Sequence, residues 1–368
     1  MTKRGPQPGQ SPEQRAQELK RRHVEARRRQ TGRRRTWMAV AATAIVLAVV
    51  AGVLTARALG PWGSGRGPAA SAATRPAASS SAASASAGEA ASPATQSTPK
   101  PTFVVGRALG DVRALEDIGV RRAGSGAEKR GAASISRRLV AAGAKPETRT
   151  FRLPNGKTSR NVVARFPGST RKTIILGAHM DSKAPSPGAN DNGSGCGALL
   201  EIARCLGQRH AYPTVELVFF GAEEMIDADP DHHHFGSRYY VKEMSAGARK
   251  NAAGMISVDM IGYGPHSVVR TMGNGPQSLR RLLMRQARER GIHLSYLRDP
   301  GESGWSDHEA FELAGIPAAW IEWRDDPVYH TSADTSGHLV AAKVRIAGQF
   351  VLGVLYGMDA AALERLAR

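Results

Sequence analysis

From residue 126 onward, the positions of the hydrophobic residues predict strands that alternate with helices. Short β-branched runs such as Thr173-Ile174-Ile175-Leu176 are separated by longer segments in which apolar residues recur at helical spacing. Such alternation favours right-handed crossovers, and therefore a largely parallel sheet between helices. We predict strands at 172–178, 213–220, 253–259 and 316–321, and helices at 126–142, 193–207, 236–248, 276–290 and 338–357.

A β-hairpin is predicted ahead of the first of these strands. The segments TRTFRL (148–153) and RNVVARF (160–166) flank Pro154-Asn155-Gly156, which is a turn signal between two β-rich runs. No internal repeat is visible. Residues 102–368 are therefore expected to form one α/β domain, which is long enough to bury a full core.

The first 57 residues predict a membrane-anchoring segment ahead of the α/β domain. Residues 1–36 hold twelve Lys and Arg against three Glu and carry +9 of the chain's net charge of +19. The stretch 37–57 follows, with twenty uncharged residues from Trp37 to Ala56, enough for one helix across a hydrocarbon core of roughly 30 Å. Since Lys and Arg flank a span on its inner side, we expect a cytoplasmic basic tail and an extracytoplasmic remainder.

A cleaved export signal is the alternative for residues 37–57. Ala56-Arg57-Ala58 offers an A-x-A-like exit, and cleavage there would make the protein secreted. Residues 58–101 are rich in Ala, Ser and Pro, a composition typical of a disordered linker. The basic tail abuts a membrane span and lacks base-stacking aromatics, so we expect lipid contact and no nucleic-acid binding. The oligomeric state is unknown from the sequence.

The two cysteines are not expected to form a disulfide with each other. Cys196 and Cys205 lie nine residues apart on one predicted helix, which places them on opposite faces and roughly 13 Å apart along the axis. We expect both to be small buried apolar residues.

Side chains suited to a metal ion follow the predicted strands with regularity. In open parallel sheets ligands bind beyond the carboxyl ends of the strands, so these positions are expected to converge. Two imidazoles and three carboxylates suit a pair of Zn²⁺ ions, each with an open position for water. The five candidate ligands are His179, Asp191, Glu224, Asp259 and His330.

This hypothesis gives roles to Asp191, to the pair of glutamates and to Asp181. Asp191 is expected to be shared between two ions about 3.5–4 Å apart. Of the adjacent Glu223 and Glu224, one would bind metal and the other would take a proton from water. Asp181 could accept the second N–H of His179. Taken singly, each residue also fits a blander interpretation, as a strand-end cap or part of a solvated face.

The motifs around these residues resemble the M28 family of co-catalytic zinc exopeptidases. The resemblance implies that His179 and Asp259 hold one zinc, that Glu224 and His330 hold the other, and that Asp191 bridges them. It also implies Glu223 as general base, Tyr329 as a stabiliser of the oxyanion, and a mixed sheet between helices. The matching segments are HMD (179–181), GANDNGSG (188–195), GAEE (221–224), VDMIGY (258–263), SDHEAF (306–311) and YHTSADT (329–335).

The segment MIDADPDHHHF (225–235) departs from simple aminopeptidases because it is longer than their usual link. Its Asp and His residues could form an additional metal site, but a solvated rim loop is favoured. This loop, DSK (181–183) and Cys196 also resemble glutaminyl cyclases, which share the fold and use one zinc. Tyr329 where those cyclases typically have Trp, Asn192 and the intact VDMIGY favour a peptidase.

We therefore expect a membrane-anchored, extracytoplasmic zinc aminopeptidase that acts on peptides with a free N-terminus. A glutaminyl cyclase and an inactive peptide-binding ectodomain are the alternatives. Asp307 and His308 are expected either to support the site or to cap a helix. Trp305, Trp320 and Trp323 are expected either in the specificity pocket or, as is commoner, in the core.

Overall fold

The structure, a computed structural model, describes residues 100–301 and 303–367. The predicted basic tail (1–36), the predicted membrane span (37–57) and all but the last two residues of the predicted linker (58–101) lie outside the described residues. Within the described part, no single helix has the length and apolar character to cross a membrane. The helices Ala341–Tyr356 and Ala360–Leu366 meet that condition only as a pair, with a bend of 105° between them.

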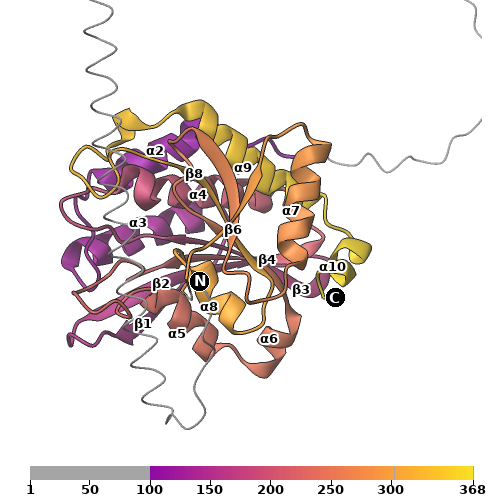
Figure 1. Cartoon of the computed structure of the whole chain (residues 1–368), viewed down its shortest axis with the longest axis horizontal. Helices are drawn as coiled ribbons and strands as arrows, with labels where there is room; N and C mark the ends of the chain where they lie inside the picture. The colour runs from indigo at the N-terminus through magenta and orange to yellow at the C-terminus, as the bar shows by residue number, and fades with distance from the viewer. Residues whose placement is uncertain (1–99, 302, 368) are drawn as a thin grey trace, which may run out of the picture. The chain divides into compact units, whose positions relative to one another are not determined.

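One mixed sheet organises the described residues (Figure 1). Its central strands β4, β3, β5 and β8 are parallel, as predicted. The pairs β1–β2, β2–β4 and β6–β8 are antiparallel, and β7 is parallel to β6. The short turn after β1 forces the antiparallel pairing of β1 with β2. The order is β1 (Glu147–Arg152), β2 (Thr158–Phe166), β4 (Pro213–Phe220), β3 (Thr170–His179), β5 (Ala252–Val258), β8 (Ala318–Arg324), β6 (His266–Thr271) and β7 (Ser295–Arg298).

Helices cover both faces of this sheet (Figure 1). One face carries α2 (Val105–Glu116), α3 (Gly126–Ala141), α4 (Gly195–Gln208), α7 (Ser278–Glu289) and α9 (Ala341–Tyr356). The other face carries α5 (Phe235–Glu243) and α8 (His308–Leu313). Shorter elements complete the fold: η1 (Ala189–Ser194), α6 (Ala246–Asn251), η2 (Ser336–His338) and α10 (Ala360–Leu366).

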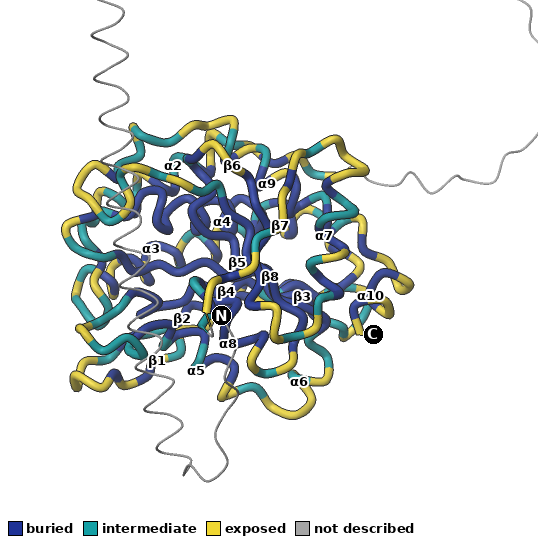
Figure 2. The backbone as a smooth tube through the Cα atoms, viewed as in Figure 1, coloured by how far each residue is buried: buried dark blue, intermediate teal, exposed yellow. Residues whose placement is uncertain are grey.

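The central strands are apolar on both sides because both faces are covered. Successive side chains point to opposite faces, so Ile174 packs in the cluster beneath α4 whereas Ile175 packs in the cluster beneath α5 and α8. Leu217 and Val218 divide in the same way on β4. Figure 2 shows β3, β4 and β5 buried over almost their whole length.

The predicted helix 236–248 is wrong in one respect, because the structure has two helices there. α5 ends at Glu243, and α6 begins after Ser245, whose side chain accepts a hydrogen bond from the Ala248 N–H. Ser is a preferred N-cap residue, so it starts a new helix at that position. Cys196 and Cys205 are both free and buried on α4, as predicted.

A buried arginine holds the loop that follows β3. Arg121 is fully buried. Its guanidinium donates to backbone carbonyls at both ends of this loop and to two carbonyls near the end of α2. The acceptors are the carbonyl oxygens of Leu115, Gly119, Met180, Pro187 and Gly188. Arg121 therefore fixes the backbone that leads from His179 to the turn containing Asp191.

The substitution Arg121→Met is expected to lower the free energy of unfolding by about 3 kcal/mol or more, because each buried carbonyl left without a donor costs about 1–3 kcal/mol. Urea unfolding followed by circular dichroism measures the change. Arg122→Met is the matched control, since Arg122 is exposed. Equal midpoints for the two variants would contradict the role given to Arg121.

Candidate metal centre

The cluster of candidate ligands lies at the carboxyl edge of the parallel strands. β3 ends in His179, and the loops after β4 and β5 begin with segments that carry Glu223, Glu224 and Asp259. His330 belongs to the loop after β8. These strands are neighbours and run in the same direction, so residues distant in sequence meet at one edge.

Asp191 lies between the two histidines of the cluster. Its Oδ1 is 3.0 Å from His179 Nε2, and its Oδ2 is 3.0 Å from His330 Nε2. The backbone amide of Asp191 donates to Asp334 Oδ2 at 3.2 Å. One carboxylate thus contacts both imidazoles, and Asp191 lies where it could be shared between two ligand groups.

Asn192 brings the Asp191 turn against the end of β5. Its side-chain amide donates to the Val258 carbonyl, and its Oδ1 accepts from the backbone amides of Gly195 and Met260. A Cβ atom on Gly195 would lie only 2.0 Å from the Val258 oxygen, so the close approach of α4 to β5 requires glycine there.

The first group of potential ligands contains His179, Asp259 and Glu223. His179 Nε2 lies 3.6 Å from Asp259 Oδ1 and 3.9 Å from Glu223 Oε2. The Ser306 hydroxyl donates to Asp259 Oδ2 at 2.7 Å, whereas Oδ1 is buried without a hydrogen-bond partner among the described residues. A buried carboxylate oxygen beside an imidazole nitrogen is an incomplete polar environment that a divalent cation would complete.

The second group contains Asp191, Glu224 and His330. His330 Nε2 lies 2.8 Å from Glu224 Oε1. The Tyr329 ring stacks on the His330 ring with centroids 3.7 Å apart, and 42% of Tyr329 is exposed. Histidine nitrogens and carboxylate oxygens are the ligands that zinc accepts, so both groups fit such an ion.

Asp181 holds the backbone of the two adjacent glutamates. Its Oδ1 and Oδ2 accept from the backbone amides of Glu223 and Glu224, each at 3.1 Å. The second nitrogen of His179, Nδ1, lies 3.2 Å from the Asp181 carbonyl oxygen and 3.7 Å from its carboxylate. The residue predicted to orient His179 thus lies against it, and its carboxylate binds the loop after β4.

Glu223 is a buried carboxyl beside the cluster. Burial raises its pKa to about 7, and the charge of Glu224 adds to this effect against the opposing influence of His179 and His234. Burial also raises the pKa of Glu224, with Asp191 contributing. A carboxyl whose pKa is raised by burial accepts a proton more readily, as suits a general base.

The pKa values of Asp191 and His234 are set by their charged neighbours. Burial opposes the charged form of Asp191, but hydrogen bonds from His179 and His330 outweigh it and hold its pKa below the usual range. Burial likewise opposes protonation of His234, yet Glu223 and Glu309 outweigh it and raise its pKa to about 10. Charge complementarity therefore dominates over burial at these groups.

Several residues that support the site were not singled out from the sequence. Asp334 accepts from the backbone amides of Asn190 and Asp191 and from the Ser186 hydroxyl, so it fixes the turn that presents Asp191. His234 contacts Glu223 directly. Asp334 lies inside the YHTSADT motif, four residues after His330, and this closeness in the sequence could have identified it as part of the site.

The structure gives a position to residues for which the sequence left alternatives. Asp307 precedes α8 without capping it through its side chain. His308 Nε2 lies 3.0 Å from Asp299 Oδ2, in a fully buried pair. Trp320 is a core residue whose indole N–H donates to the Asp259 carbonyl, so it supports the centre. Trp323 is half-buried beneath Lys343.

Fold and site together define an α/β protein with a two-part cluster of histidines and carboxylates, suited to divalent cations, at the carboxyl edge of its sheet. The sequence profile of peptidase family M28 matches residues 161–355, and the chain belongs to that family. The family resemblance predicted from the motifs is thereby confirmed.

Known proteins of two kinds are similar to this chain. Aminopeptidase YwaD of Bacillus subtilis is 28% identical over 222 residues, which cover 58% of this chain and 47% of the relative. The chain spans about half the length of the curated relatives it matches first. The structure of BSAP, a zinc aminopeptidase from Bacillus subtilis, superposes with a TM-score of 0.63 at 19% identity over 70% of this chain and 96% of the other, a likeness of fold.

A second structural relative is a glutaminyl cyclase. The Bacteroides thetaiotaomicron enzyme, solved with N-acetylhistamine bound, superposes with a TM-score of 0.61 at 25% identity. The match covers 71% of this chain and all of the cyclase chain. Aminopeptidases and cyclases thus share the fold described here.

Proposed function

We propose that this chain is a zinc-dependent aminopeptidase that hydrolyses the N-terminal residue from peptides. The observation that carries the proposal is the position of Asp191, whose two carboxylate oxygens each lie 3.0 Å from a histidine of a different ligand group. A single carboxylate shared by two ligand groups would let two ions lie close together and act on one substrate. Membership of peptidase family M28 supports the same chemistry.

The described residues supply enough ligands for two ions. His179 and Asp259 would hold one, Glu224 and His330 the other, and Asp191 would contact both. Bound divalent ions would polarise the peptide carbonyl and lower the pKa of a water molecule. The partnerless Oδ1 of Asp259 supports this assignment.

Glu223 is the proposed general base. Its buried carboxyl lies beside His179, with Oε2 3.9 Å from Nε2, and burial raises its pKa, which favours the uptake of a proton. It would accept the proton of the attacking water and return it to the leaving amine. Asp181 keeps Glu223 and Glu224 in register by binding both backbone amides.

Tyr329 is the proposed oxyanion donor. It is partly exposed and stacks on His330, so its side chain borders the cluster from the solvent side. A phenolic O–H donates a hydrogen bond to an oxygen on which charge develops. The free amine of a peptide would lie against the carboxylates of the cluster, which would restrict the substrate to unblocked N-termini.

The location of the reaction is proposed to be outside the cytoplasm. The basic tail 1–36 and the apolar stretch 37–57 support a single-pass cell-membrane protein with the domain 102–368 on the outer side. Cleavage after the apolar stretch would release the same domain as a secreted enzyme.

Glutaminyl cyclase activity is the second candidate, with one zinc and an N-terminal glutamine as substrate. The likeness to the Bacteroides thetaiotaomicron cyclase favours it, together with the loop Met225–His234. An inactive peptide-binding domain is the third, and the complete ligand set argues against it.

Peptide products distinguish these candidates. The purified full-length chain with added zinc is expected to release free leucine or lysine from peptides that begin with those residues, and to leave N-acetylated versions intact. Mass spectrometry of the products provides the measurement. Loss of ammonia from a Gln-initiated peptide without release of any amino acid would instead identify a cyclase, and unchanged peptides would contradict both activities.

A further inference from the structure

The loop between β4 and α5 carries three consecutive histidines with different environments. His232 is partly exposed, and its Nδ1 lies 2.7 Å from Asp227 Oδ2. His233 and His234 are each only 3% exposed. The predicted solvated rim loop is thus wrong at these two positions, because the loop turns inward before α5 begins.

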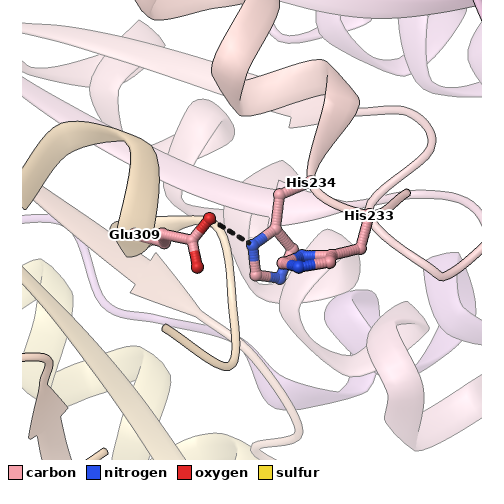
Figure 3. Close-up of side chains that lie close together, drawn as sticks. All are labelled: His233, His234 and Glu309. Atoms are coloured by element: carbon pink, nitrogen blue, oxygen red, sulfur yellow. Dashed lines mark ion pairs between the residues drawn. The ribbon is translucent and has the colours of Figure 1, made fainter. Parts of the chain in front are cut away.

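The inner end of the loop meets α8 at Glu309. Figure 3 shows the His234 ring directed at the Glu309 carboxylate with the His233 ring beside it, and His234 Nδ1 lies 3.4 Å from Glu309 Oε1. Ligand atoms of these three residues lie within 4.8 Å of one another, so residue types alone would suggest a metal site.

Arg238 argues against a metal ion at this cluster. Its Nη2 lies 2.6 Å from Glu309 Oε1 and 3.4 Å from His233 Nε2. A guanidinium stays charged in proteins, so a permanent cation already neutralises the only carboxylate of the group. A second cation there would meet the repulsion of this half-buried guanidinium, beside side chains that are almost fully buried.

The opposite side of the His234 ring faces Glu223. His234 Nε2 lies 2.8 Å from Glu223 Oε1, a distance typical of a charge-assisted hydrogen bond. The other carboxylate oxygen, Oε2, is the one nearest His179. His234 therefore holds one oxygen of Glu223 while the other faces the cluster.

The backbone fixes the ring in this position. The His234 amide donates to the Glu223 carbonyl at 2.9 Å, and the Phe235 amide donates to the Ala222 carbonyl. His234 has a φ of 53°, in the left-handed region that a non-glycine residue rarely adopts. Such a conformation persists only where the surroundings impose it, and here it aims the ring at Glu223.

We infer that His234 is a positioning residue for Glu223, held from behind by Glu309 and Arg238, so that Glu223 presents Oε2 to the reacting water. The inference rests on the proposed aminopeptidase function. It assigns the loop Met225–His234 a task, because the loop delivers a hydrogen-bond donor that neither β4 nor α5 provides.

The test compares two substitutions at His234 in the zinc-loaded full-length chain. His234→Leu removes the donor and keeps the volume, and is expected to lower kcat on a Leu-initiated peptide by about 10²-fold. KM should stay nearly constant, since only the orientation of Glu223 changes. His234→Gln keeps an N–H donor at similar reach and is expected to recover most of the lost kcat.

Two controls accompany these kinetics. His232→Leu makes the same change at the partly exposed histidine of the loop and is expected to retain the wild-type kcat. Zinc per chain, measured by inductively coupled plasma mass spectrometry, and the thermal midpoint are recorded for every variant. The inference expects His234→Leu to keep the wild-type zinc content.

The outcomes separate this inference from the proposed function. An active wild type with an equally active His234→Leu overturns the inference alone, as does equal loss of kcat in the Leu and Gln variants. Loss of one zinc equivalent in His234→Leu would make the cluster a metal site and overturn the positioning role. A wild type without aminopeptidase turnover overturns the function and this inference together.

Discussion

The substitution Glu223→Gln is expected to lower kcat by about 10²–10⁴-fold, the range that a positioned general base contributes. The amide keeps the size of the carboxyl but cannot accept a proton from water. Zinc content should stay at the wild-type level, since the proposed ligands are other residues. Single-turnover kinetics on a Leu-initiated peptide, together with zinc analysis, measures the effect.

The matched control for this change is Glu243→Gln, the same substitution at the exposed end of α5. It should leave kcat unchanged. A Glu223→Gln variant as fast as the wild type would remove that residue from the chemistry, and a variant that lost zinc would make it a ligand.

The substitution Asp191→Ala is expected to reduce bound zinc at both ligand groups and to abolish turnover. Its carboxylate contacts both His179 and His330, so its removal takes one ligand from each group. Removing a residue shared by two sites affects both, whereas Asp259→Ala should affect chiefly the group of His179. Zinc per chain after dialysis, and turnover with excess zinc restored, provide the measurements.

Asp117→Ala serves as the control for that prediction, because Asp117 is exposed at the end of α2. It should retain the wild-type zinc content and turnover. Full zinc occupancy in Asp191→Ala would show that the two ligand groups act independently of this residue.

The central strands could be predicted because their burial leaves a clear pattern. β3 and β4 are covered on both faces, so their sequences are short apolar runs with β-branched residues. β6 and β7 were missed. β7 (Ser295–Arg298) has no fully buried residue and lies at the edge of the sheet, so no apolar pattern marks it.

The ligand cluster could be predicted because its residues follow the strands directly in the sequence. His179 ends β3, and Asp259 comes directly after β5, so the parallel sheet alone brings them together. The contact between His234 and Glu223 depends instead on the path of a ten-residue loop and on a left-handed backbone. The hydrophobic periodicity contains no information about the path of the loop or about its left-handed residue. The contact could therefore be found only in the structure.

Of two residues that support the site, the sequence offered a signal for one and none for the other. Asp334 lies in a quoted motif, whereas Arg121 precedes the first predicted helix, in a segment without a pattern. Its role arises from carbonyls that converge in space, since its acceptors extend from Leu115 to Gly188. Such convergence has no signature in a single sequence.

A crystal of the full-length chain grown with zinc, with diffraction recorded at the zinc absorption edge, tests the two-ion centre most directly. The account predicts two anomalous peaks, one beside His179 and Asp259 and one beside Glu224 and His330, with Asp191 touching both. An empty cluster would contradict the account. A single peak would contradict the two-ion mechanism and favour the cyclase.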